Sequence, residues 1–201
     1  TGAITGETPN RAVTLTNAAS CIATTSTSGT SSPSNLTVIA WFRTTSTAGG
    51  KILGFESPRT GVTAYSSGGR YDRHLYMDAR GQVWFGTATN QTVRAIRSTT
   101  ALNDGQWHMA AGVLSSAGMR LYIDGALVAS NNVSSVSSYT GWWRAGCGNL
   151  SGWGSYWDGG SSPSASWNQP RNFPFAGSLD DLSVWHQPLA AAAHQLAQHR
   201  R

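Results

Sequence analysis

The segment at residues 103–129 constrains the fold of this chain more than any other part of it. Strand-prone runs at 107–114, 119–123 and 127–129 alternate with turns at 103–105, 115–118 and 124–125. Asn-Asp-Gly and Asp-Gly favour turns because these residues tolerate positive φ, and a two-residue Asp-Gly turn matches the twist of a hairpin. The segment therefore predicts three consecutive antiparallel strands, which bury their apolar face only against a second sheet.

Composition favours one extracellular β-domain. The chain has 201 residues, which suits a single domain, and only 11% of them are charged, whereas 23 are Gly and 9 are Trp. We expect residues 11–201 to form the domain behind an N-terminal tail at 1–10, in a secreted or cell-surface protein. No apolar run approaches the roughly 20 residues of a membrane span, and no signal peptide is recognisable. We therefore expect no membrane insertion, and a mature chain or an excised domain.

The charge pattern does not indicate a nucleic-acid surface. The formal net charge is +5, and Lys51 is the single lysine among many arginines. A nucleic-acid surface needs clustered basic residues. Here the arginines are scattered, and the tight groups are Arg70 with Arg73 and Arg200 with Arg201. We expect no nucleic-acid partner.

Two cysteines, Cys21 and Cys147, are present without a C-x-x-C motif. A thiol-based zinc site and a thioredoxin motif are thereby excluded. A single disulfide between Cys21 and Cys147 is the natural interpretation for a secreted domain. The alternative is a pair of buried free thiols.

The rest of the chain is also strand-rich. Alternation and β-forming residues predict a first strand pair within 11–23 and strands at 36–44, 51–55, 74–77, 82–87, 93–98, 142–146 and 175–185. Two long loops are expected at 56–73 and 149–172, and a loop without periodicity as long as the second is usually functional or mobile. An Ala-rich run at 189–199, behind Pro188, predicts a short C-terminal helix.

Several motifs together resemble a known family. They lie at 40–44 (A-W-F-R-T), 49–55 (G-G-K-I-L-G-F), 72–78 (D-R-H-L-Y-M-D), 103–129, 141–144 (G-W-W-R), 148–150 (G-N-L) and 175–182 (F-A-G-S-L-D-D-L). In this order they resemble laminin G-like domains of the concanavalin A-like superfamily, of the type found in secreted proteins of high-GC Gram-positive bacteria. The resemblance implies an all-β, two-sheet antiparallel jelly-roll sandwich, and it implies binding or adhesion only as a class.

The carboxylates argue against an enzyme. Glycosidases need two carboxylates flanking the scissile bond, and laminarinase-type relatives carry them as E-x-D-x-x-E. This motif is absent, because Glu7 and Glu56 are the two glutamates. An aspartate pair stays open, but Asp180 and Asp181 are adjacent on a strand and point to opposite faces. No G-x-S-x-G or H-E-x-x-H occurs.

Asp180 is the candidate metal ligand. It is expected to share a strand face with Leu182 and Val184 and so to be partly buried, and a buried carboxylate needs a partner. Three partners are open: Ca²⁺, which prefers oxygen ligands, Arg144, or main-chain amides. The resemblance to laminin G-like domains adds weight to calcium, because these and pentraxin-like domains often carry Ca²⁺, and a purely structural hydrogen-bonding role stays open beside it.

The candidate ligand-binding residues come from the two long loops. The second loop combines aromatic faces with amide and charged groups, which suits sugar recognition; its candidates are Tyr156, Trp157, Asp158, Trp167, Asn168 and Arg171. The alternative is that these aromatics cover the edge of the sandwich, the role expected for Trp153. The first loop supplies Arg59 and Tyr71, and arginine there pairs with a uronate, sialate or phosphate, unless the loop is only solvated.

These observations predict a non-catalytic carbohydrate-binding or surface-recognition module. Its partner is expected to be a glycan or a glycosylated surface component. A protein–protein adhesion module and a structural spacer without ligand are the alternatives. Two internal roles are also expected: Asp72-Arg73-His74 as a salt-linked turn, and His108 as a satisfied strand histidine.

Overall fold

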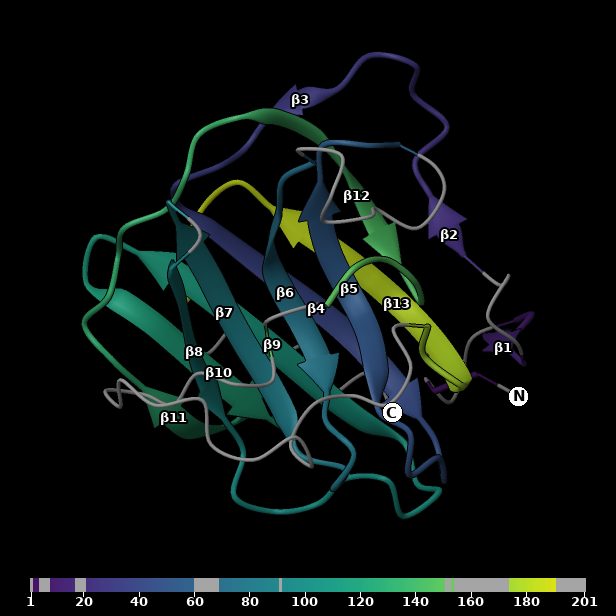
Figure 1. Cartoon of the computed structure of the whole chain (residues 1–201). Helices are drawn as coiled ribbons and strands as arrows, with labels where there is room; N and C mark the ends of the chain where they lie inside the picture. Colours follow the sequence, from purple (N-terminus) through teal and green to yellow (C-terminus); the bar gives the residue numbers. More distant parts are fainter. Residues whose placement is uncertain are drawn as a thin grey trace.

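Two antiparallel β-sheets pack face to face in the computed structural model, which describes residues 2–3, 8–16, 21–59, 69–90, 92–150, 153 and 174–190 (Figure 1). The six-stranded sheet has the order β1 (Val13–Leu15), β13 (Gly177–Trp185), β4 (Leu36–Arg43), β9 (His108–Ser115), β10 (Gly118–Ile123) and β11 (Ala126–Ser130). The seven-stranded sheet has the order β2 (Ile22–Ala23), β12 (Thr140–Ala145), β5 (Gly50–Glu56), β6 (Tyr71–Met77), β7 (Val83–Thr89) and β8 (Thr92–Arg97), with β3 (Thr30–Ser31) paired to β12. The predicted jelly-roll sandwich is confirmed.

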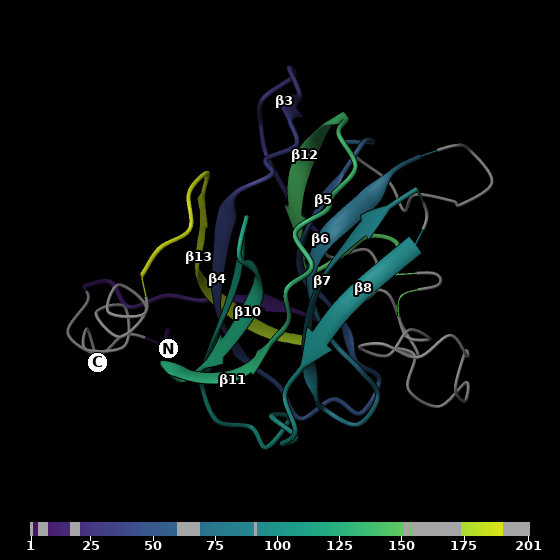
Figure 2. The same ribbon diagram turned by 90° about the vertical axis from the view of Figure 1, so that its left-hand side faces the viewer.

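The core lies between the two layers, which Figure 2 shows from the side. β4 and β5 alternate inward and outward side chains, yet nearly all of their residues are buried. Both outer faces carry apolar clusters of their own. One, on the six-stranded sheet, includes Ile39, Trp41 and Met109; the other, on the seven-stranded sheet, includes Tyr76 and Trp153. The sandwich therefore buries apolar surface on both sides of its sheets, which is why the strands read as dense apolar runs.

The predicted meander is confirmed as β9, β10 and β11, paired in that order. Asp124 and Gly125 form the hairpin turn with φ of 49° and 76°. Positive φ at both central residues is the requirement of a type I′ turn. The local sequence thus determines this hairpin.

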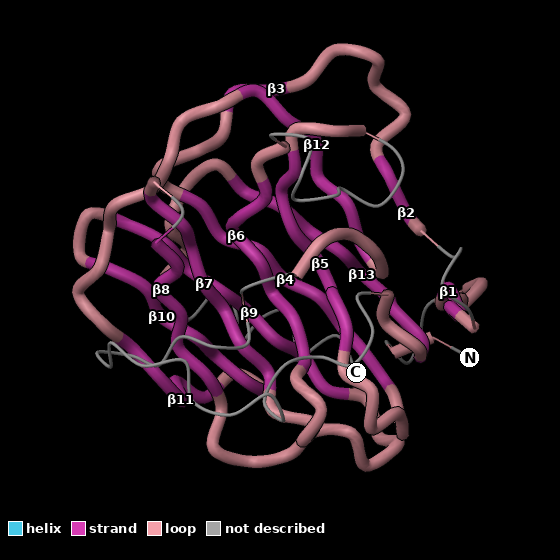
Figure 3. Tube along the Cα trace, in the orientation of Figure 1, coloured by secondary structure: helices cyan, strands magenta, loops and turns pink. Residues whose placement is uncertain are grey.

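The structure corrects two sequence-based expectations, the length of a loop and the pairing of the first strands. The loop expected at 56–73 is shorter, because β5 extends to Glu56 and β6 begins at Tyr71 (Figure 3). Arg73 has φ of 51°, and the pairing of β5 with β6 shifts register twice, which hides the strand alternation. The strand pair expected within 11–23 is split between the sheets, since β1 pairs with β13 and β2 with β12.

The described residues contain strands and no helix, and none of their segments is a helix long and apolar enough to cross a membrane. The helix expected at 189–199 lies outside these residues except for 189 and 190, which have no regular secondary structure. That helix stays a prediction.

The predicted disulfide is present. Cys21 and Cys147 are bonded with a Cα–Cα distance of 5.1 Å across a sequence separation of 126 residues. Arg144 Nη2 donates hydrogen bonds to both sulfur atoms, at 3.3 Å to Cys21 and 3.0 Å to Cys147. The bond fastens the entry to β2 beside the exit of β12.

We predict that removing this disulfide lowers stability substantially, because it closes a long loop in the unfolded chain. The chain-entropy model gives about 5 kcal/mol for a loop of this length. Urea unfolding with and without reductant measures the difference. The Cys21→Ala/Cys147→Ala variant serves as the control, because its midpoint should not respond to reductant. Equal midpoints for the oxidised and reduced wild-type chain would contradict the prediction.

Candidate functional site

A recess of about 360 Å³ opens at the end of the sandwich where β1, the start of β13 and the end of β4 meet, at the lower right of Figure 1. Its lining residues are Thr14, Leu15, Arg43, Thr44, Thr45, Ser46, Gly105, Ala176 and Gly177. Most of them bring hydroxyl or main-chain polar groups, and none brings a carboxylate. The recess is therefore suited to a ligand rich in hydrogen-bonding groups.

Strand register places the polar side chains of this site in one row. Thr14 pairs with Ser178 on β13, and Ser178 pairs with Arg43 on β4. The neighbouring pair of Phe42 with His108 sets Arg43 opposite Trp107. Because Phe42 points into the core, residue 43 points to the outer face of the six-stranded sheet. We call Thr14, Ser178, Arg43 and Trp107 the Arg43 row.

Arg43 is held against an aromatic ring. Its guanidinium carbon lies 5.0 Å from the Trp107 ring centroid. This cation–π contact restrains the guanidinium without using its N–H groups, which can still form hydrogen bonds. The ion pairs formed among the described residues involve other cations: Lys51, Arg73, His108 and Arg144.

The loop that forms one wall of the recess is tied down by hydrogen bonds. Thr44 Oγ1 donates to Ala176 O at 2.5 Å and accepts the Ser46 N–H at 2.9 Å. Asn103 Nδ2 donates to Ser46 O at 3.1 Å, and Gly105 N donates to Thr44 O at 3.0 Å. The wall is thus pre-formed, while Thr45 is exposed at its rim.

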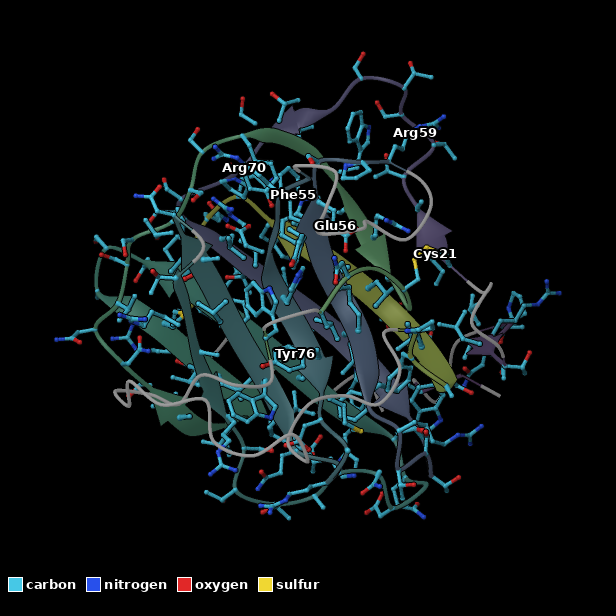
Figure 4. All side chains as sticks on the ribbon, viewed as in Figure 1. Cys21, Phe55, Glu56, Arg59, Arg70 and Tyr76 are labelled. Atoms are coloured by element: carbon cyan, nitrogen blue, oxygen red, sulfur yellow. A yellow bond between two sulfur atoms is a disulfide. The ribbon has the colours of Figure 1, made fainter. Side chains whose placement is uncertain are left out.

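A second polar centre lies buried on the outer face of the seven-stranded sheet. Glu56, labelled in Figure 4, forms ion pairs with Lys51 and with Arg144, whose Nη1 lies 2.8 Å from Glu56 Oε2. The Asn149 N–H also donates to Glu56 Oε1, at 3.1 Å. Side-chain exposure is 0% for Lys51 and Glu56 and 2% for Arg144. We call Lys51, Glu56 and Arg144 the Glu56 triad; its geometry serves structure, because Glu56 contacts no solvent.

Asp72, Arg73 and His74 are internal as expected, but they lie in β6 and not in a turn. Arg73 pairs with Asp72 and donates to Pro33 O at 2.8 Å and Ser137 O at 2.9 Å. Burial raises the pKa of Asp72 although Arg73 beside it acts in the opposite sense. Burial likewise lowers the pKa of His74 well below its ordinary value, with the nearby charges of Lys51 and Arg73 adding to the effect.

The predicted ligand-binding residues fall into two groups. Arg59 lies at the end of the sandwich away from the recess, as Figure 4 shows together with Arg70. Tyr71 is 9% exposed, and its ring centroid lies 6.0 Å from that of His74. The remaining candidates lie outside the described residues: Tyr156, Trp157, Asp158, Trp167, Asn168 and Arg171. Ligand contact by all of these side chains stays a prediction.

Two structural roles expected from the sequence are confirmed. Trp153 is 1% exposed, and its carbonyl accepts a hydrogen bond from Tyr76 Oη at 2.8 Å. His108 lies between two carboxylates, with Nδ1 2.7 Å from Asp124 Oδ2 and Nε2 3.1 Å from Asp104 Oδ1. The hydrogen bond to Asp124 raises the pKa of His108.

Asp180 has main-chain partners. Its Oδ2 accepts the Ala3 N–H at 2.7 Å and its Oδ1 accepts the Asp181 N–H at 3.0 Å. Arg144, one of the partners considered for it, binds Glu56 instead. The expected shared face with Leu182 and Val184 is wrong: a bulge between Asp180 and Ser183, with Asp181 at φ 42°, moves Asp180 to the outer face opposite Trp41. One inserted residue reverses the alternation of a strand.

Oxygen atoms of the kind that bind Ca²⁺ surround Asp180, but few of them come from carboxylates. Asp180 Oδ2, Asn10 Oδ1 and Arg11 O all lie within 3.0 Å of the position that a Cβ would take at Gly2. Oxygen donors of this kind suit Ca²⁺. Among the described residues, however, no three His, Cys, Asp or Glu side chains gather as metal ligands. Calcium binding at Asp180 therefore stays a prediction.

Sequence reasoning missed the Arg43 row. From the sequence, Arg43 is one of several scattered arginines and Trp107 is the first residue of a predicted strand. A partial signal existed, because the alternation of W-F-R places Arg43 opposite to the core residue Phe42. The partners across β1 and β13 have no local signal, since they depend on pairings between distant segments.

Comparison with known proteins identifies one family and several solved structures of similar fold. The family model described as Concanavalin A-like lectin/glucanases superfamily matches residues 16–193. No match was found among curated proteins. Among solved structures, the CBM40 of Ruminococcus gnavus IT-sialidase is similar with TM-score 0.58 and 14% identity, over 93% of this chain and 96% of that one. A second structure of that CBM40 is bound to α2,3 sialyllactose.

Two further solved structures show the same fold. Domains LG4-5 of the mouse laminin alpha1 chain have TM-score 0.57 and 20% identity, over 89% of this chain and 42% of that one. Domain 4 of AbnA, an extracellular arabinanase of Geobacillus stearothermophilus, in complex with arabinotriose, has TM-score 0.54 and 15% identity, over 92% of this chain and 74% of that one. At these identities the likeness shows the fold alone.

We predict that Glu56→Gln destabilises the fold by about 3–5 kcal/mol, because two buried cations lose their shared counter-charge. Urea unfolding at neutral pH measures the loss. Asp181→Asn is the matched control, since it neutralises an exposed carboxylate and should change stability by less than about 0.5 kcal/mol. Equal stability of the two variants would show that the Glu56 triad does not hold the fold.

We predict that the free energy of unfolding rises with pH above about pH 8, because of the titration of Lys51. Burial lowers the pKa of Lys51 from 10.5 to about 8, although Glu56 beside it acts in the opposite sense. Between these values the unfolded chain binds more protons, so the free energy of unfolding rises, by roughly 1–2 kcal/mol from pH 8 to pH 9.5. Burial raises the pKa of Tyr76 and Tyr139, which lowers stability only above about pH 10. Unfolding of wild type and Lys51→Met over this window measures the effect, and a similar rise in both chains would refute it.

Proposed function

The chain belongs to the concanavalin A-like lectin/glucanases superfamily, and we propose that it is a non-catalytic recognition module that binds a carbohydrate or a glycosylated surface component. The observation that carries this proposal is the pre-formed recess with the Arg43 row beside it. Its lining combines hydroxyls, main-chain groups and a guanidinium, and Trp107 lies at its margin. Sugars present hydroxyl groups for such polar partners and C–H faces for an aromatic ring.

Three buried carboxylates, those of Glu56, Asp72 and Asp78, have structural partners, which supports a non-catalytic role. A glycosidase needs two carboxyl groups roughly 5–10 Å apart across a cleft. Glu56 and Asp72 are engaged in buried ion pairs. Asp78 accepts hydrogen bonds from the Arg80 and Gln82 amides and the Trp84 indole. The recess itself has no carboxylate in its lining.

The similar structures and the disulfide support the same proposal. Two of those structures hold an oligosaccharide, sialyllactose in one and arabinotriose in the other. A disulfide persists in oxidising surroundings, so the bond between Cys21 and Cys147 favours a secreted or cell-surface protein. Neither observation names the sugar.

We predict saturable binding of the purified chain to at least one saccharide on a broad glycan and polysaccharide array. The array is run once with millimolar Ca²⁺ and once with EDTA. Binding only with Ca²⁺ would support calcium at Asp180 in a calcium-dependent module, whereas equal binding in both would contradict a calcium requirement. Incubation of the bound glycan with the chain should release no shorter product.

Side-chain variants separate the possible contact regions. Trp157→Ala and Trp167→Ala test the aromatic loop predicted from the sequence, and Trp107→Phe tests the margin of the recess. A selective loss of affinity by one of these variants locates the contact. No binding to any glycan would contradict the proposal and would favour a protein–protein adhesion module or a structural spacer.

A further inference from the structure

We propose that the Arg43 row recognises the anionic group of an acidic saccharide, a carboxylate or a sulfate. This inference rests on the proposed carbohydrate function and specifies its ligand class. Its basis is a guanidinium that packs on an aromatic ring, has no carboxylate partner among the described residues and lies beside hydroxyl groups in a pre-formed recess.

Several arginines of the described residues are satisfied by polar partners, whereas Arg43 is held by an aromatic ring. Arg73 is paired with Asp72 and Arg144 with Glu56. Arg97 donates to the side-chain oxygen of Gln82, and Arg94 donates to a main-chain carbonyl. Arg43 instead contacts the ring of Trp107, which satisfies no N–H group. No described residue accepts a hydrogen bond from its guanidinium, so these N–H groups can bind a ligand or water.

The chemistry of the guanidinium selects the ligand group. Arginine presents parallel N–H donors that match the two oxygens of a carboxylate or sulfate, and such charge-assisted pairs are stronger than neutral ones. The contact with Trp107 holds the guanidinium plane, so less side-chain freedom is lost on binding. Because the recess has no carboxylate in its lining, nothing in that lining repels an anion.

The neighbours of Arg43 supply groups for the sugar ring itself. Thr14 Oγ1 and Ser178 Oγ are 3.2 Å apart, and either of them can be the donor. One hydroxyl hydrogen of the pair is therefore left for a ligand oxygen. Thr45 adds an exposed hydroxyl at the rim. An anion alone would not need these hydroxyls, whereas a sugar that carries the anion would use both kinds of group.

Arg120 offers a matched control on the same face. It pairs with Val113 on β9, whereas Arg43 faces Trp107, the residue that precedes that strand. Six residues of strand separate the two positions, or about 20 Å. Replacing either arginine by glutamine removes the same charge from the same sheet. The formal net charge of +5 gives a weak, salt-sensitive attraction for any polyanion, and both variants reduce it equally.

The test compares short saccharides that differ only in charge, by calorimetric titration at about 150 mM salt, where long-range attraction is screened. One arm uses an oligogalacturonate and its methyl ester; the other uses a sulfated oligosaccharide and its desulfated form. We expect at least one acidic member to bind more tightly than its neutral counterpart. We expect Arg43→Gln to lower that affinity about ten-fold or more, Arg43→Lys to restore it only in part, and Arg120→Gln to leave it unchanged. Thermal unfolding of each variant establishes that it is folded.

The outcomes separate this inference from the function on which it rests. Equal binding of charged and neutral members, or equal loss in the Arg43 and Arg120 variants, overturns the inference. If wild type and Arg43→Gln bind neutral glycans alike on the array, the carbohydrate function stands and the acidic ligand class is wrong. If neither the array nor the titrations show binding, both fail. The arm in which Arg43→Gln loses affinity identifies the anion as carboxylate or sulfate.

Discussion

The arrangement of the seven-stranded sheet depends on the buried ion pairs that the Glu56 carboxylate forms. This carboxylate joins Lys51 and Arg144 from β5 and β12 to the Asn149 amide beyond β12. Arg144 also donates to the disulfide, so one side chain links the charged triad to the covalent bond. Gly148, with φ of 125°, passes so close that a Cβ there would meet Glu56 and Lys51. A buried ion pair adds little net stability, but breaking it is costly because a charge is left unpaired. The triad therefore fixes where the chain leaves β12 more than it raises the overall stability.

The partners of the charged side chains differ between the interior of the sandwich and the recess. Among the described residues, buried carboxylates have polar partners: Asp72 pairs with Arg73, and Asp78 accepts hydrogen bonds from neutral donors. At the recess Arg43 contacts an aromatic ring, and no carboxylate of the described residues pairs with it. Burying an unmatched charge completely is expensive, and Arg43 avoids this cost because it is only partly buried. A cation tolerated in this position keeps its hydrogen-bonding capacity, which is what a binding site requires.

Local sequence signals predicted the fold well and the site poorly, for one physical reason. The hairpin at Asp124 and Gly125 depends on the φ preference of two adjacent residues, so the sequence reveals it directly. The partner of Glu56 on β12 is 88 residues away, and no local pattern pairs them. Asp180 was assigned to the wrong face because a single bulged residue, Asp181, reverses the alternation. Arg43 was overlooked because its row exists only through the pairing of β1 with β13 and of β13 with β4. These strands are far apart in the sequence, so no local pattern reveals the row.

The recess also depends on how the N-terminal segment is held. β1 contributes Thr14 and Leu15 to the lining, yet it pairs through three residues with β13 alone. So short an edge strand is marginal by itself. Asp180 lies two residues beyond Ser178 on the same face of β13, and it holds the Ala3 amide. Ala3 also packs in the apolar cluster of Trp41 on the outer face of the sheet. Asp180 thus acts on the recess indirectly: it fastens the chain that leads into β1, and β1 in turn forms the wall opposite Arg43. A carboxylate first singled out as a metal ligand thereby has a role in shaping the site without contacting the ligand.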